Sequence, residues 1–132
     1  MARYIEPLSD IVKFEPRLVT YPCPGCDAKF KRVNCVSNGT FCGMKHSEKL
    51  QLDGAAIVME GLREHCIFTI NSREKGKQFF EYVKRAHEVF RTRITQEDSE
   101  KVMDGLEINQ GLIEQCVERS FADGDPEHAN NT

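Results

Sequence analysis

The chain has 132 residues, of which 39% are hydrophobic and 30% are charged, as in a folded domain and unlike a disordered segment. The formal charge of −3 is concentrated near the C-terminus, where residues 92–132 carry ten acidic and three basic side chains. No basic patch with interleaved aromatic residues occurs, which argues against a nucleic-acid partner. No apolar stretch is long enough to span a bilayer, so we expect contact with a membrane only through regions outside this chain.

The N-terminal part predicts an entry segment followed by one strand and one helix. Residues 1–16 contain two prolines and predict little regular structure. The apolar run Leu18–Tyr21 predicts a strand over residues 17–21. A helix is expected after the turn Cys23-Pro24-Gly25-Cys26, continuing through Phe30 and Val33.

The next part predicts a loop, a helix and a second short strand. Residues 34–52 are polar and rich in cysteine, and Asn38-Gly39 is a turn signal, so they predict a loop held by disulfides. Asp53 is a suitable cap for a helix. The alternation over residues 66–70 predicts a short strand, and residues 71–76 a turn. The expected buried side of the helix holds Ile57, Val58, Met59, Leu62 and Cys66.

The C-terminal part predicts three more helices. An apolar stripe at helical spacing covers residues 79–90. Thr95 begins the next helix, and Asn109 caps the last one, which ends before Gly124-Asp125-Pro126. Two short strands leave a sheet too small to satisfy its own edges. This shortage predicts that the domain is truncated after Thr132.

Six cysteines are more than a reducing cytosol usually supplies without a metal or a redox role. The first reading of the cluster Cys23, Cys26, Cys35 and Cys42 is a zinc site. Structural zinc sites usually hold two tight pairs of ligands, whereas eight residues separate Cys26 from Cys35 and six separate Cys35 from Cys42. We therefore expect no metal, and we expect no other cofactor.

The second reading is a redox pair, in which Cys23 is the attacking sulfur and Cys26 the resolving one. A strand that leads into a helix through a CxxC turn places the thiols near the positive end of the helix, which favours the thiolate. Thioredoxin-like enzymes bring a cis-proline loop against this pair. No proline lies between Pro24 and Pro126, which weakens this reading.

The third reading is a set of structural disulfides. Cys35 and Cys42 would close a short loop, worth about 2 to 3 kcal/mol in the loop-entropy picture. Cys66 and Cys116 lie on apolar faces of two elements, where they could form a bridge or remain buried thiols. Asn38-Gly39-Thr40 and Asn130-Asn131-Thr132 are acceptor sequons for N-glycosylation, at Asn38 and Asn130.

Cysteine usage favours an oxidising compartment, but the N-terminus lacks the apolar core and the cleavage site of a signal peptide. We interpret the chain as a piece of a longer secretory protein whose signal and anchor lie elsewhere.

The joint pattern of several segments from about Asp10 to Asn130 resembles the central lumenal domain of vacuolar sorting receptors. The resemblance rests on their order and approximate spacing. The segments are Leu18-Val19-Thr20-Tyr21-Pro22-Cys23-Pro24, residues 34–42, 53–66 and 79–83, Gly105-Leu106-Glu107-Ile108, Ile113-Glu114-Gln115-Cys116-Val117 and Gly124-Asp125-Pro126-Glu127.

This resemblance implies an α/β fold, helix-rich and thioredoxin-like, over residues 17–132, with a helical insertion at about residues 72–122. It implies a receptor, not an enzyme, which binds soluble protein cargo in the lumen of the Golgi and routes it to endosome or vacuole. The family typically has a cysteine at the position of Cys23 but none at Cys26. The CxxC turn of this chain therefore either restores a redox pair or forms a different structural disulfide. The alternative function is that of a thiol-disulfide oxidoreductase that uses Cys23 and Cys26.

Overall fold

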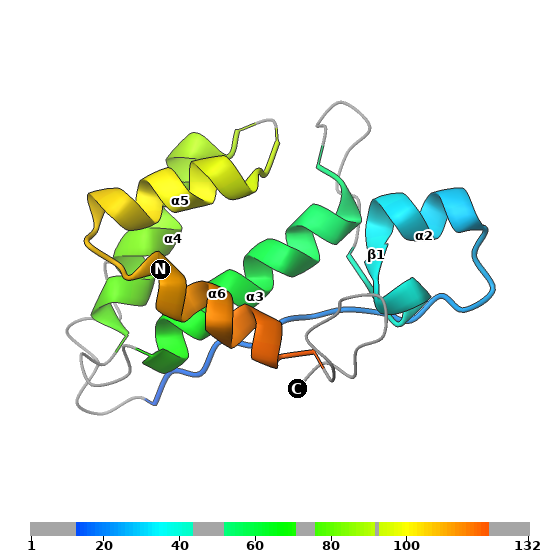
Figure 1. The fold of residues 1–132 in the computed structure, drawn as a ribbon, viewed down its shortest axis with the longest axis horizontal. Helices are drawn as coiled ribbons and strands as arrows, with labels where there is room; N and C mark the ends of the chain where they lie inside the picture. The colour runs from blue at the N-terminus through cyan, green and yellow to red at the C-terminus, as the bar shows by residue number, and fades with distance from the viewer. Residues whose placement is uncertain (1–12, 44–51, 71–75, 92, 122–132) are drawn as a thin grey trace.

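The computed structural model describes residues 13–43, 52–70, 76–91 and 93–121. Figure 1 shows α3 crossing the centre of the molecule, with α4, α5 and α6 at one end and α2 with a small hairpin at the other. The elements in chain order are α2 (Ala28–Asn34), β1 (Cys35–Val36), the 3-10 turn η1 (Ser37–Gly39), β2 (Phe41–Cys42), α3 (Gly54–Ile70), α4 (Lys77–Val89), α5 (Gln96–Gly105) and α6 (Gln110–Arg119).

Residues 13–20 form an extended segment that runs along α3 toward the hairpin (Figure 1). Their side chains alternate between half-buried and exposed positions, as in a strand lying on a helix. Phe14 anchors one end of the segment, with its ring centroid 4.9 Å from Phe80 and 5.9 Å from Phe79. The predicted strand over residues 17–21 is thus extended, but within the described residues only Tyr21 pairs, through an isolated bridge to Cys42.

The sheet of the described residues has two antiparallel strands, in which Cys35 lies opposite Cys42 and Val36 opposite Phe41. The second predicted strand, over residues 66–70, is wrong, because α3 continues without a break to Ile70. Cys66 and Ile67 are both fully buried, which a helix packed between other helices allows and an alternating strand does not. Tertiary packing therefore overrides the local strand preference.

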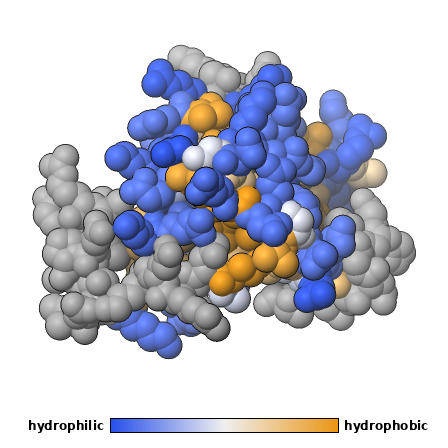
Figure 2. Space-filling model, turned by 60° about the vertical axis from the view of Figure 1, so that its left-hand side comes forward, coloured by the Kyte–Doolittle hydropathy of each residue, from blue (hydrophilic) through white to orange (hydrophobic). Residues whose placement is uncertain are grey.

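The core lies between α3, α4, α5 and α6. Val58, Leu62 and Cys66 are buried as predicted, whereas Ile57 and Met59 are only half-buried. Figure 2 shows one face of the molecule, on which some apolar side chains are visible between hydrophilic ones. The buried residues of the main cluster are Leu62, Cys66, Ile67, Phe79, Tyr82, Ala86, Val102, Met103, Ile108, Ile113, Val117 and Phe121.

Two predicted helix starts are confirmed. The hydroxyl of Thr95 accepts a hydrogen bond from the backbone N–H of Asp98 at 3.1 Å. The side chain of Asn109 accepts one from the N–H of Leu112 at 3.2 Å. Each cap satisfies an N–H group that has no partner inside its helix.

The described part of the chain is helix-rich, with five α-helices and one small sheet. This agrees with the helix-rich expectation, and a larger α/β sheet is not seen within these ranges. None of the described helices has the length and apolar character that crossing a bilayer requires. Of the predicted turn at residues 71–76, only Gly76 is among the described residues. The ends of the chain, which include Asn130, lie outside them.

Candidate functional site: the CxxC turn and the disulfide-linked hairpin

Cys23 and Cys26 form a disulfide at the turn that leads from the extended segment into α2, with their Cα atoms 5.4 Å apart. Both residues are half-buried, and Pro24 and Gly25 between them are exposed. The backbone N–H of Cys26 donates to the carbonyl of Cys23 at 3.3 Å. The side chain of Asp27 then caps α2 by accepting from the N–H of Phe30 at 2.7 Å. This arrangement presents the disulfide at the surface, where an external thiol could reach it.

Cys35 and Cys42 form a second disulfide, directly across the two strands of the hairpin, with Cα atoms 4.0 Å apart. Both residues are buried. At the tip, Ser37, Asn38 and Gly39 have φ values of 53°, 51° and 90°. The short turn therefore uses three consecutive left-handed residues, and the disulfide holds the strands that carry it.

The CxxC turn and the hairpin form one unit. The N–H of Cys23 donates to the carbonyl of Gly39 at 2.8 Å. The backbones of Tyr21 and Cys42 exchange two hydrogen bonds, of 3.1 and 2.9 Å. A Cβ atom at Gly39 would lie 2.9 Å from the carbonyl oxygen of Cys23, so only glycine fits this contact. The structure therefore brings together the four cysteines of the cluster that the sequence analysis singled out.

Asn34 joins this unit to α3, a role that the sequence analysis missed. Its side-chain oxygen accepts from the N–H of Gly54 at 3.2 Å, and its carbonyl accepts from the N–H of Gly43 at 2.9 Å. Asn34 is buried, and a Cβ atom at Gly54 would approach the Asn34 carbonyl within 2.7 Å. The two glycines thus permit a close approach of three backbone segments. Gly54, directly after the predicted cap Asp53, was the one sign in the sequence of a close backbone contact at this helix start.

Cys66 and Cys116 form the third disulfide, which links α3 to α6. Their Cα atoms are 5.9 Å apart, Cys66 is fully buried and Cys116 is half-buried. This bond closes a loop that contains both α4 and α5. It holds the ends of the helical part together.

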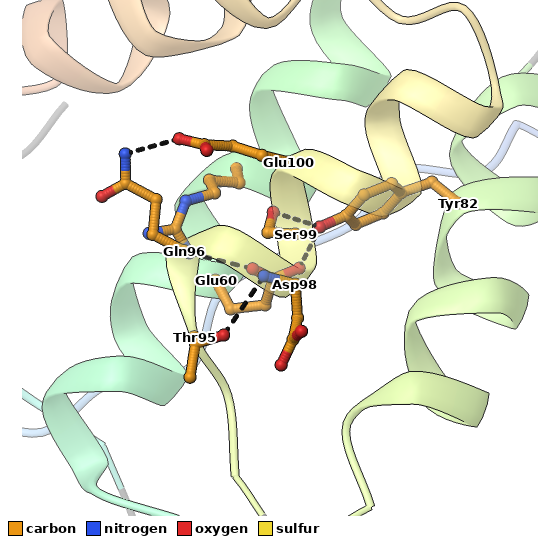
Figure 3. Close-up of polar contacts among 8 residues, drawn as sticks. Glu60, Tyr82, Thr95, Gln96, Asp98, Ser99 and Glu100 are labelled. Carbon is orange, nitrogen blue, oxygen red and sulfur yellow. Dashed lines mark hydrogen bonds and ion pairs between the residues drawn. The ribbon is translucent and has the colours of Figure 1, made fainter.

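A buried polar cluster joins α3, α4 and α5, and no pattern in the sequence pointed to it. The hydroxyl of Tyr82 donates to Glu60 at 2.5 Å and lies 2.6 Å from the hydroxyl of Ser99 (Figure 3). Arg63 pairs with Glu60 at 2.9 Å. All four residues are buried, and the hydrogen bonds partly compensate the loss of water, since Nε of Arg63 has no hydrogen-bond partner among the described residues.

Burial also governs the titration of the carboxyl groups near this cluster. It raises the pKa of Glu60, against the opposing effects of Tyr82 and Arg63. Burial, with the charge of Glu60 one turn away, raises the pKa of Glu64 to about 7. Both carboxyl groups border a cavity of about 820 Å³. None of the hydrogen bonds described above joins this cluster to the unit that the CxxC turn and the hairpin form.

Asn38, the first predicted glycosylation residue, is exposed at the tip of the hairpin. The hydroxyl of Thr40, which completes the sequon, is 2.7 Å from the carbonyl of Ser37. Within the described ranges, no group of three or more His, Cys, Asp or Glu side chains is arranged to hold a metal ion.

Comparison with known proteins gives one match. A family model described as the vacuolar sorting receptor thioredoxin-like domain matches residues 2–131. No curated protein and no solved structure matches the chain.

Proposed function

Because this chain belongs to the vacuolar sorting receptor family through its thioredoxin-like domain, we propose that it binds soluble protein cargo as a lumenal segment of such a receptor. The observation that carries the proposal is the match of the family model to residues 2–131. The three disulfides support a place in the lumen of the Golgi, endosome or vacuole, because such bonds persist in oxidising compartments. In this proposal the domain acts as a binding platform and not as a catalyst.

The proposed contact surface for cargo is the segment of residues 34–52, of which the structure describes residues 34–43 and 52. The Cys35–Cys42 bond and the contact of Gly39 with Cys23 fix the shape of its hairpin. A turn fixed in this way loses little conformational entropy when a partner binds it. Asn38 and Thr40 are exposed at this tip.

The test compares two double variants that each remove one disulfide. Cys35→Ala with Cys42→Ala alters the proposed contact surface, whereas Cys66→Ala with Cys116→Ala leaves it intact and serves as the control. Binding to purified soluble vacuolar proteins is measured by surface plasmon resonance at a temperature where both variants are folded. We expect the first variant alone to lose binding. Equal binding by the two variants would contradict the role of the hairpin.

A second candidate function is thiol-disulfide exchange, which the surface position of the Cys23–Cys26 bond favours. After reduction, the Cys23 thiolate would attack a substrate disulfide, form a mixed disulfide and release one product thiol. Cys26 would then attack the mixed disulfide, release the second thiol and restore the internal bond. The net result is two-electron reduction of the substrate and oxidation of the cysteine pair.

This candidate predicts that reduced Cys23 reacts with iodoacetamide well below the free-thiol pKa of about 8.5. Reduction of a disulfide-linked peptide should disappear in Cys23→Ser, and Cys26→Ser should accumulate the mixed disulfide. The receptor proposal predicts neither turnover nor accumulation. The two functions are therefore separated by one set of variants.

A further inference from the structure

A groove of about 750 Å³ lies along the extended N-terminal segment, bordered by α3 and α6. Leu18, Leu62, Ile70 and Leu112 give it an apolar lining. Leu112 is 47% exposed and Ile70 is 38% exposed, so the groove is open to solvent. Large apolar side chains that line an open groove are typical of a binding surface.

Among the described residues, the backbone beside this groove is extended and has an edge without a strand partner. Tyr21 directs its N–H and C=O to Cys42, and Cys23 directs its N–H to Gly39. Since successive residues of an extended chain direct these groups to opposite edges, those of Leu18 and Thr20 face away from the hairpin. Within the described ranges, no hydrogen bond joins the backbone of residues 13–20 to another residue. Such an edge is a template for one more strand.

The charges around the groove favour an acidic partner. Arg17 and Arg119 border it, and among the described lining residues Glu15 is the one carboxylate. Arg17 lies 3.5 Å from Glu15 in a pair that is largely exposed, so Glu15 offsets part of this charge and Arg119 remains. An exposed pair of this kind contributes little by itself and is readily exchanged for a partner's carboxylate.

We propose that this groove binds a partner polypeptide in extended conformation, which adds a strand to the open edge at Leu18 and Thr20. Alternate apolar side chains of the partner pack against Leu112 and Ile70, and an acidic side chain pairs with Arg119. The backbone groups of the edge specify a polypeptide, because a peptide strand supplies matching donors and acceptors at the right spacing. Among the described residues of the proposed cargo surface, Phe41 alone lines this groove, whereas Asn38 and Thr40 at the tip do not. The site therefore goes beyond the proposed cargo surface and can fail independently of it.

The probe is the acetylated and amidated peptide Glu-Val-Thr-Val-Thr-Val-Glu, titrated to about 1 mM into the isotopically labelled full chain with its disulfides formed. We expect the backbone amide signals of Leu18 and Thr20 to shift. The same peptide with N-methyl groups on alternate amides should bind at least about tenfold more weakly, because it cannot complete the ladder. Absence of the shifts, or equal binding of the methylated peptide, would overturn the proposal.

Two matched variants test the apolar wall. Leu112→Asn places an amide in the groove, and Val89→Asn does the same at an equally exposed position (47%) on α4, outside the groove. Circular dichroism and thermal unfolding show whether each remains folded. We expect Leu112→Asn to weaken peptide binding about tenfold and Val89→Asn to leave it unchanged. Equal loss in both variants would show that the peptide does not occupy this groove.

Discussion

The phenol of Tyr82, on α4, hydrogen-bonds to the carboxylate of Glu60 on α3 at 2.5 Å, in the interior of the molecule. Ser99 on α5 shares the same hydroxyl at 2.6 Å. One side chain thus connects three helices through polar contacts among buried residues. Such a cluster stabilises one arrangement of helices only while each member has its partner.

Removal of the Tyr82 hydroxyl should destabilise the fold. Tyr82→Phe leaves Glu60 and Ser99 short of a partner in a buried place, and we expect a loss of about 1 to 3 kcal/mol in the free energy of unfolding. Urea denaturation measures it. Tyr21→Phe, at a half-buried tyrosine outside the cluster, is the control. A loss no larger than that of the control would show that the cluster contributes no stability.

The stability of the chain should fall as the pH rises from about 4.5 to about 7, because of Glu64. Its pKa is raised from 4.5 to about 7 in the folded state, so the folded chain binds a proton more tightly than the unfolded chain. The stabilisation is complete below pH 4.5 and is lost as the pH rises through 7. Its size is at most about 3 kcal/mol, because the half-buried carboxyl group is partly screened by water.

The measurement for Glu64 is the free energy of unfolding at pH 5 and pH 8. Glu64→Gln should remove the part of the loss that is due to this carboxyl group, since the amide carries no charge at either pH. Glu60, whose pKa burial also raises, keeps its own share. Glu81→Gln, at an exposed position of α4, should leave the loss of stability between pH 5 and pH 8 unchanged. If both variants retain the loss found in the parent chain, another group is responsible.

Removal of the Cys66–Cys116 bond should cost more stability than removal of the Cys35–Cys42 bond. Cys66 and Cys116 are 50 positions apart in the sequence, whereas Cys35 and Cys42 are 7 positions apart. In the loop-entropy picture these amount to about 4 and about 2.5 kcal/mol. Denaturation of the two double alanine variants checks the order. Unchanged thermal unfolding of the parent chain under reductant would contradict a stabilising role for both.

Asn38 should carry an N-linked glycan when the chain is made in a secretory host. Its side chain is exposed at the hairpin tip, in a left-handed conformation that asparagine tolerates better than most residues. Asn38→Gln and Thr40→Ala should each remove the mass of one glycan, and Thr40→Ser should retain it. An unchanged mass in Asn38→Gln would exclude this site.

The sequence by itself determined the local features whose causes lie within a few residues. Thr95 and Asn109 were predicted as helix starts, because a cap needs only a side-chain oxygen placed before the first turn. The helix after the CxxC turn followed from similar local signals. The family was also visible in the joint order of the cysteine segments, which the family model confirms.

Tertiary structure decided the features that depend on residues far apart in the chain. Residues 66–70 alternate like a strand but are helical, because α3 packs between other helices and buries adjacent residues such as Cys66 and Ile67. The contact of Tyr82 with Glu60 joins positions 22 residues apart, and no spacing rule relates them. The groove beside Leu18 forms only where an extended segment meets two helices. Local propensity acts over one or two turns, whereas burial and pairing depend on which surfaces meet.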